Sequence, residues 1–312
     1  MIGAIFNIIA PVAIVILFGY LAVKLKFFPK EGVPYITKFV HSFSVPLLLF
    51  NAVRQIDFAE QYDPKILAGY FLPLLLVFAI GIFSARKFGK GPQASVVLAF
   101  CAIFANSVYI GLPVSERAFG ADSLMTNFII LSVHAPFCYV LGAISIQIAR
   151  PEAIKWSSIA RNIGADLVRN PLIIGTFLGA TVNLLGVEFP VVLDDAITML
   201  ARAALPVALF GLGGVLTGLK VKGEVLPIAT IVTLRMALHP TLVLLFTLYV
   251  FQLDLNIVKS MVLIAAIPTG TNGFIFAALY KREEELAASI VFVATLLSLF
   301  TLPIWLLIIN QL

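Results

Sequence analysis

Hydrophobic residues in this chain gather in long runs that short polar segments separate. A run of about 20 apolar residues is long enough to cross a bilayer as a helix. The pattern therefore predicts an all-α polytopic membrane protein with ten transmembrane helices in a single membrane domain. The longest connection, residues 150–169, is polar and is expected to hold a short interfacial helix around Trp156. The ten runs cover residues 3–23, 34–53, 65–84, 93–119, 123–149, 170–186, 190–217, 225–251, 257–281 and 285–309.

Two of these runs, the fourth and the ninth, have interrupted centres. Residues 104–113 read Phe-Ala-Asn-Ser-Val-Tyr-Ile-Gly-Leu-Pro, and residues 267–273 read Ile-Pro-Thr-Gly-Thr-Asn-Gly. Glycine and proline weaken a helix, and broken backbone at membrane depth is tolerated only inside protein or beside a wet cavity. Two interrupted spans in corresponding halves indicate the binding site of a secondary transporter.

The order of prolines and glycines predicts an internal repeat. Pro11 and Gly19 recur 160 residues later as Pro171 and Gly179, and the segment 46–50 recurs as 206–210. Asn106 corresponds to Asn272 at a shift of 166 residues. Pro73 and Pro136 correspond to Pro240 and Pro303 at a shift of 167. We therefore expect residues 1–150 to form one five-helix repeat and residues 151–312 a second. Because five is odd, the second repeat would be inverted in the membrane.

Composition and charge fit this picture. Of the 312 residues, 61% are hydrophobic and 12% charged, with a mean hydropathy of +1.06. With the N-terminus outside, fourteen Lys and Arg residues fall in inner loops and only Arg54, Lys65, Arg117 and Lys259 in outer ones. This bias predicts that both termini face the outside or periplasm. The net charge of +5 follows from the inner loops and requires no nucleic-acid partner.

Several segments together resemble the auxin efflux carrier family of membrane transporters. These are residues 11–20, 39–50, 106–113, the Arg-Asn-Pro at 169–171, and the Leu-Pro at 205–206. The chain lacks the long cytoplasmic loop of the plant carriers, so it resembles the short prokaryotic branch, which implies a prokaryotic inner-membrane location. The resemblance implies the fold of bile acid sodium symporters, in which helices four and nine cross as broken helices. It also implies an elevator-like mechanism and an organic anion such as malonate or malate.

The polar groups at the two interruptions are the predicted substrate-binding residues. A half-helix that begins at a break presents unpaired N–H groups and a positive dipole end, which suit a carboxylate. The alternative is that these side chains only satisfy backbone freed by the kinks. The predicted set is Asn106, Ser107, Gly111, Pro113, Pro268, Thr269, Gly270, Thr271 and Asn272.

Four charged or titratable residues complete the candidates. Arg235 lies deep in a span and could pair with a substrate carboxylate; the alternatives are snorkelling to the cytoplasmic face or pairing with a carboxylate for assembly. Arg202 is a gating candidate whose simpler reading is a pair with Asp194 or Asp195. His41 and Glu116 are coupling candidates, with a packed histidine and an outer-loop carboxylate as the respective alternatives.

Other chemistry has little support. Cys101 and Cys138 both lie in predicted spans, and the three histidines lack metal-ligand spacing. Gly211–Gly214 is not preceded by the strand of a nucleotide-binding loop. From these observations together we expect no enzymatic activity, no bound metal and no cofactor. We predict a secondary transporter of a small mono- or dicarboxylate, with H⁺ or Na⁺ left open as the coupling ion. A sodium-coupled symporter of larger amphipathic anions, a channel or a non-transporting sensor are the alternatives, and a homodimer is expected only by analogy.

Overall fold

The structure is a computed structural model that describes residues 2–55, 63–120, 123–150, 170–219 and 221–312. The first half contains α1 (Ile2–Lys24), α2 (Val33–Phe39), α3 (Val45–Val53), α5 (Pro64–Lys87), α6 (Pro92–Ile103), α7 (Leu112–Phe119) and α8 (Leu124–Ile148). The second half contains α10 (Pro171–Leu185), α11 (Val191–Arg202), α12 (Ala204–Leu216), α13 (Val225–Thr233), α14 (His239–Leu245), α15 (Leu255–Ala265), α16 (Asn272–Tyr280) and α17 (Glu284–Ile309). The expected helix around Trp156 lies outside the described residues.

Each of the ten predicted runs is helical, but not all are continuous spans. Within the described residues, seven helical stretches are long and apolar enough to cross a membrane. The other runs hold the shorter helices α6, α10 and α15, of 12, 15 and 11 residues. Helices α6 and α15 are short because the two predicted interruptions end them. Ten crossings and an inverted arrangement of the two halves therefore stay predictions.

Prolines account for three local irregularities in the helices. Three π-helical segments, Val40–Ser44, Ser107–Gly111 and Leu234–Leu238, each end two residues before a proline. Proline lacks an N–H and its ring displaces the carbonyl four residues earlier, so the chain widens locally. At Pro240 the freed carbonyl of Met236 accepts a hydrogen bond of 2.8 Å from the Trp305 indole.

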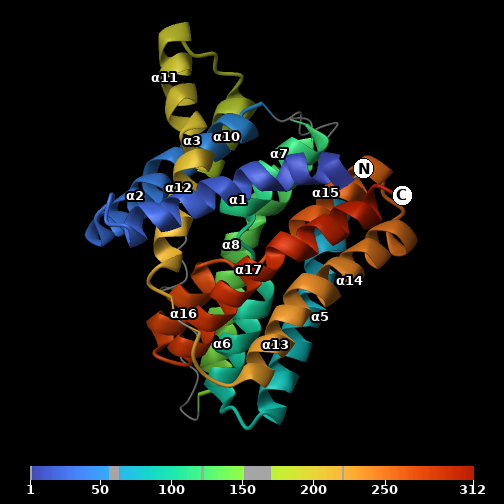
Figure 1. Cartoon of the computed structure of the whole chain (residues 1–312). Coiled ribbons are helices and arrows are strands. Elements are labelled where there is room, and N and C mark those ends of the chain that lie inside the picture. The colour runs from blue at the N-terminus through green and yellow to red at the C-terminus, as the bar shows by residue number, and fades with distance from the viewer. Residues whose placement is uncertain (1, 56–62, 121–122, 151–169, 220) are drawn as a thin grey trace.

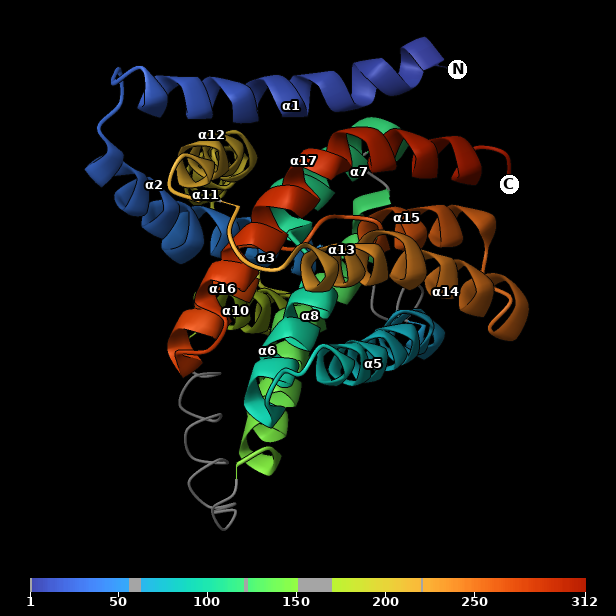
Figure 2. The ribbon, with the colours of Figure 1, turned by 60° about the horizontal axis from the view of Figure 1, so that its bottom comes forward.

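The helices pack in two groups, and each group takes helices from both halves of the chain. We call α1, α2, α3, α10, α11 and α12 the flanking group, and α5 to α8 with α13 to α17 the crossing group. In the flanking group α1 packs mainly on α12 and α10 on α3, and Figure 2 shows α1 lying along one side of the molecule. In the crossing group α6 and α15 are the most buried helices. The two termini lie at the same end of the molecule in both views (Figure 1 and Figure 2).

Glycines bring the backbones of the flanking group together. A Cβ on Gly19 would stand 2.1 Å from the carbonyl oxygen of Phe210, and one on Gly179 would stand 2.7 Å from that of Phe50. Both members of the first contact lie 160 positions from their counterparts in the second. The α1–α12 and α10–α3 contacts thus lie at positions that the predicted repeat relates. In both, a small residue lets two membrane helices approach closely.

Candidate functional site

The two interruptions predicted from the sequence lie side by side and hold each other. Ala105 and Thr269 form an antiparallel bridge pair. The Gly270 N–H donates to the Phe104 carbonyl and the Asn106 N–H donates to the Pro268 carbonyl, each over 2.9 Å. Backbone groups that the breaks free from their own helices are thereby satisfied in the other chain segment. We call residues 104–106 and 268–270 the crossing.

Small and hydroxyl side chains make this close approach possible. A Cβ on Gly270 would stand 3.0 Å from the carbonyl oxygen of Ala105. The Thr269 hydroxyl is buried and donates to the Cys101 carbonyl over 2.9 Å. Thr269 therefore serves the backbone of α6, as the simpler sequence interpretation expected of such residues.

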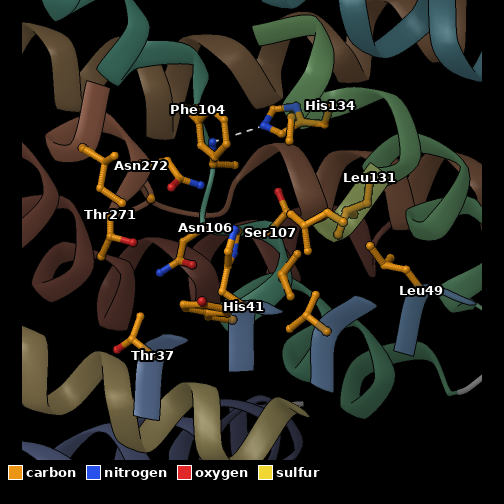
Figure 3. Close-up of a pocket in the computed structure, with 18 of the residues that line it drawn as sticks. Thr37, His41, Leu49, Phe104, Asn106, Ser107, Leu131, His134, Thr271 and Asn272 are labelled. Carbon is orange, nitrogen blue, oxygen red and sulfur yellow. Dashed lines mark hydrogen bonds between the residues drawn. The ribbon is translucent and has the colours of Figure 1, made fainter. Parts of the chain in front are cut away.

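A cavity of about 350 Å³ lies against the crossing. Figure 3 shows Asn106, Ser107, Thr271 and Asn272 around it, facing His41 from the flanking group. Its volume is in the range of small-molecule sites. The wall also includes Thr37, Lys38, Ser42, Tyr109, His134 and Gly270.

The ends of two half-helices meet this cavity. The π-helical segment Ser107–Gly111 and α16 both begin among the cavity-lining residues. The amino end of a helix carries unpaired N–H groups and about half a positive elementary charge. The side-chain nitrogen Nδ2 of Asn106, a residue that is only 6% exposed, has no hydrogen-bond partner among the described residues. The arrangement offers neutral hydrogen-bond donors and a positive potential to an anion.

Part of the predicted set lies away from the cavity wall. Gly111 packs against α15, where a Cβ would stand 2.5 Å from the Ile264 side chain. Pro113 is the second residue of α7, next to the π-helical segment, and Pro268 contributes its carbonyl to the crossing. These residues shape the break, whereas Asn106, Ser107, Gly270, Thr271 and Asn272 of the predicted set line the cavity.

Arg235 lies behind the crossing and is absent from the cavity wall. Its side chain is fully buried, its Nε donates to the Ile267 carbonyl over 2.8 Å, and its Nη1 to the Ile103 carbonyl over 3.3 Å. Nη1 also lies 3.0 Å from Nδ1 of His239. The guanidinium thus contacts both interruptions through their backbones.

Glu116 and Arg202 line a different cavity, of about 770 Å³, between α3, α7, α8, α11 and α12. The structure brings the coupling candidate Glu116 and the gating candidate Arg202 together but separates them from Asn106. Asp194, one of the expected partners of Arg202, forms an ion pair with Arg54 instead. Arg54 could not be singled out because its partner lies 140 positions away.

Several cavity residues were not in the predicted set. Thr37 and Lys38 precede His41 by about one helical turn, so a polar stripe on the second run was the available signal. His134 accepts a hydrogen bond of 3.4 Å from the Ala105 N–H, a contact that no sequence spacing encodes (Figure 3). A further cavity of about 360 Å³ shares His41 and Asn272 with the first and extends to Asn170 and Tyr280. The site therefore continues toward the carboxyl end of α16.

Comparison with known proteins identifies the family to which the chain belongs. The family model described as "Membrane transport protein" matches residues 4–306. The "Putative malonate transporter" of Rhizobium meliloti (strain 1021) is 26% identical over 299 residues, which cover 95% of this chain and 92% of that protein. The "Uncharacterized transporter YfdV" of Escherichia coli (strain K12) is 24% identical over 95% of this chain and 94% of its own. "Auxin efflux carrier component 8" of Arabidopsis thaliana is 24% identical over 93% of each chain. These matches confirm the family resemblance read from the sequence motifs.

Proposed function

Since the chain belongs to the membrane transport protein family of the auxin efflux carriers, and is a multi-pass membrane protein, we propose that it is a secondary transporter of a small mono- or dicarboxylate. The observation that carries the proposal is the cavity at the crossing, where two half-helices begin and the buried Asn106 amide lacks a partner. Similarity to a protein named as a malonate transporter supports the carboxylate class.

The cavity chemistry suits an anion that must leave again. Asn106, Thr271 and Asn272 supply neutral hydrogen bonds, and the two helix ends supply partial positive charge. A neutral donor is weaker toward a carboxylate than a bidentate arginine, so binding stays reversible. Lys38 and His41 in the opposite wall are the groups that attract the anion or respond to its charge.

The packing supports an elevator-like movement. The cavity lies between the two helix groups, with its Asn106 wall in the crossing group and its His41 wall in the flanking group. The larger cavity with Glu116 and Arg202 lies between the same two groups, toward the opposite end of α3. If the crossing group slid along the flanking group, residues 104–106 and 268–270 would move from the cavity that contains His41 to the cavity that contains Arg202. By the positive-inside bias the Asn106 cavity is on the cytoplasmic side.

The test is a thermal-unfolding screen of the purified protein against monocarboxylates and dicarboxylates. A ligand that binds only the folded protein raises its Tm with concentration, so millimolar binders register. We expect a dicarboxylate such as malonate to raise the Tm, and Asn106→Ala to weaken its binding about tenfold through the lost hydrogen bond.

The matched control is Asn256→Ala, because Asn256 is exposed near the start of α15 and far from the cavity wall. It should leave both the Tm and the ligand response unchanged. A carboxylate response that Asn106→Ala leaves intact would show that the substrate binds elsewhere. If no carboxylate raised the Tm of the folded protein, the proposed substrate class would be refuted.

A further inference from the structure

Arg235 joins two carbonyl groups that the fold places at equivalent points. Ile103 and Ile267 each lie two residues before a member of the Ala105–Thr269 bridge pair. Ile103 is the last residue of α6, and Ile267 lies two residues beyond the end of α15 at Ala265. The guanidinium binds both carbonyls from one side, while the cavity lies at the amino ends of the second half-helices.

The charges at this point balance. The carboxyl end of a helix carries about half a negative elementary charge, so the two ends together offset about one positive charge. A buried cation in a membrane protein requires such compensation. Among the described residues no carboxylate forms an ion pair with Arg235. Its other polar neighbours are Tyr70, Cys138 and His239, none of them a carboxylate, so the helix ends are its counter-charge.

The carbonyls at the carboxyl ends of broken membrane helices are ligands that Na⁺ uses in secondary transporters. Here the guanidinium already occupies the space between them. It donates to both oxygens, and arginine keeps its charge at any physiological pH. A metal cation at the same oxygens would lie against a fixed positive charge.

We propose that Arg235 is a built-in cation of the crossing: it holds the carboxyl ends of α6 and α15 together in the place of a bound Na⁺. The crossing then keeps its shape without Na⁺, and its positive charge is permanent behind the anion cavity. Arg235 is a positioning residue, because it touches the backbone of the interruptions and no part of the cavity wall. The consequence for transport, that uptake needs no Na⁺, rests on the proposed function, whereas the effect on stability does not.

The experiment measures thermal unfolding of the full chain in detergent, in NaCl and in choline chloride of equal ionic strength. We compare the wild type with Arg235→Lys, which keeps the charge, and Arg235→Met, which keeps much of the side-chain length without it. The expected Tm of the wild type is the same in both salts. Arg235→Met should lower it by about 10 °C, because two buried carbonyls lose their partner, and Arg235→Lys by clearly less. Arg86→Met, an exposed position in the last turn of α5, is the control and should leave the Tm unchanged.

Two results would overturn the inference. One is a Na⁺-specific rise in the wild-type Tm, which would show that a metal binds although the arginine is present. The other is equal stability of the Lys and Met variants, which would show that charge at this position is irrelevant. If neither variant folds, the comparison of salts on the wild type still decides. None of these readings needs a carboxylate, so failure of the substrate proposal would be seen separately, in the ligand screen.

Discussion

The crossing and the flanking group both hold two backbones at unusually short separation, but they do so by different means. In the flanking group, glycines on α1, α10 and α12 let helices touch through their backbones, as at Gly19 and Phe210. At the crossing, main-chain hydrogen bonds link residues 104–106 to 268–270, and Arg235 bonds to both segments. Steric fit fixes the first contact, and polar satisfaction fixes the second.

The difference follows from the state of the backbone. Apart from the Asn7 carbonyl that Pro11 frees, helices α1 and α12 use their hydrogen bonds internally, so dispersion and shape join them. The interrupted spans leave N–H and C=O groups unpaired in an apolar surrounding, and each must find a partner. A membrane protein therefore places its polar chemistry where its helices break. Substitutions should affect stability in the flanking group and ligand binding at the crossing.

The largest effect is expected at Gly213 in α12. A Cβ there would stand 2.0 Å from the Ile16 carbonyl oxygen and 2.7 Å from the Tyr20 nitrogen, both backbone atoms that cannot move aside. Gly213→Ala should destabilise the protein by about 3 kcal/mol, seen as a fall in Tm or loss of folded protein in detergent. Gly211→Ala is the matched control, since its nearest neighbour is a side-chain carbon at 3.4 Å. Equal Tm values for the two variants would refute the close backbone contact.

A smaller loss of stability with a larger loss of function is expected at Gly270. A Cβ there would stand 3.0 Å from the Ala105 carbonyl oxygen and 3.2 Å from the Asn106 nitrogen, inside the crossing. Gly270→Ala should stretch the bond from the Asn106 N–H to Pro268 and reduce carboxylate affinity about tenfold. Gly91 has open space where a Cβ would stand, so Gly91→Ala should leave the carboxylate affinity unchanged. If Gly270→Ala left the carboxylate affinity unchanged, the crossing would not be part of the binding site.

Arg117 connects the two helix groups and should have a moderate effect. Pro11 has no N–H, so the Asn7 carbonyl in α1 lacks its helical partner, and Arg117 Nη2 of α7 donates to it over 2.9 Å. A second bond runs from Nε to the Ile8 carbonyl over 3.2 Å. Arg117→Gln should cost about 1 kcal/mol, measured as a decrease in Tm.

The same contact can be tested with a second change. Pro11→Ala gives the Asn7 carbonyl a partner within α1, so Arg117→Gln should cost less in that background. A double-mutant cycle reports this coupling directly. Additive effects of Pro11→Ala and Arg117→Gln would contradict a shared carbonyl.

The smallest effect is expected at Lys90, which joins the amino ends of α13 and α17. Its Nζ lies 2.9 Å from Glu224 and 3.3 Å from Glu283. The hydrogen bond to Glu224 is the largest cause of a raised pKa of Lys90, so the stabilisation is present at neutral pH and is lost as pH rises through that raised value. Lys90→Gln should cost under about 1 kcal/mol at neutral pH, and less in 1 M salt, as a Tm series in NaCl would show. A loss that grows with salt would contradict an ionic origin.

The sequence by itself determined the helical runs, the two interruptions and the family. Apolar runs of membrane length and the prolines and glycines at residues 104–113 and 267–273 are local signals, because a helix and its breaks depend on neighbouring residues. The same holds for the π-helical segments before Pro46, Pro113 and Pro240. Substrate-contact candidates such as Asn106 and Asn272 could be predicted for that reason.

Only the tertiary structure decided which groups meet. It placed Arg235 against the Ile103 and Ile267 carbonyls, 132 and 32 positions away, and Glu116 with Arg202 in a cavity apart from Asn106. It also paired Asp194 with Arg54 and brought His134 to the Ala105 N–H. The physical reason is that a buried polar group must be satisfied by whatever the packing brings beside it, and packing depends on the shapes of many helices at once.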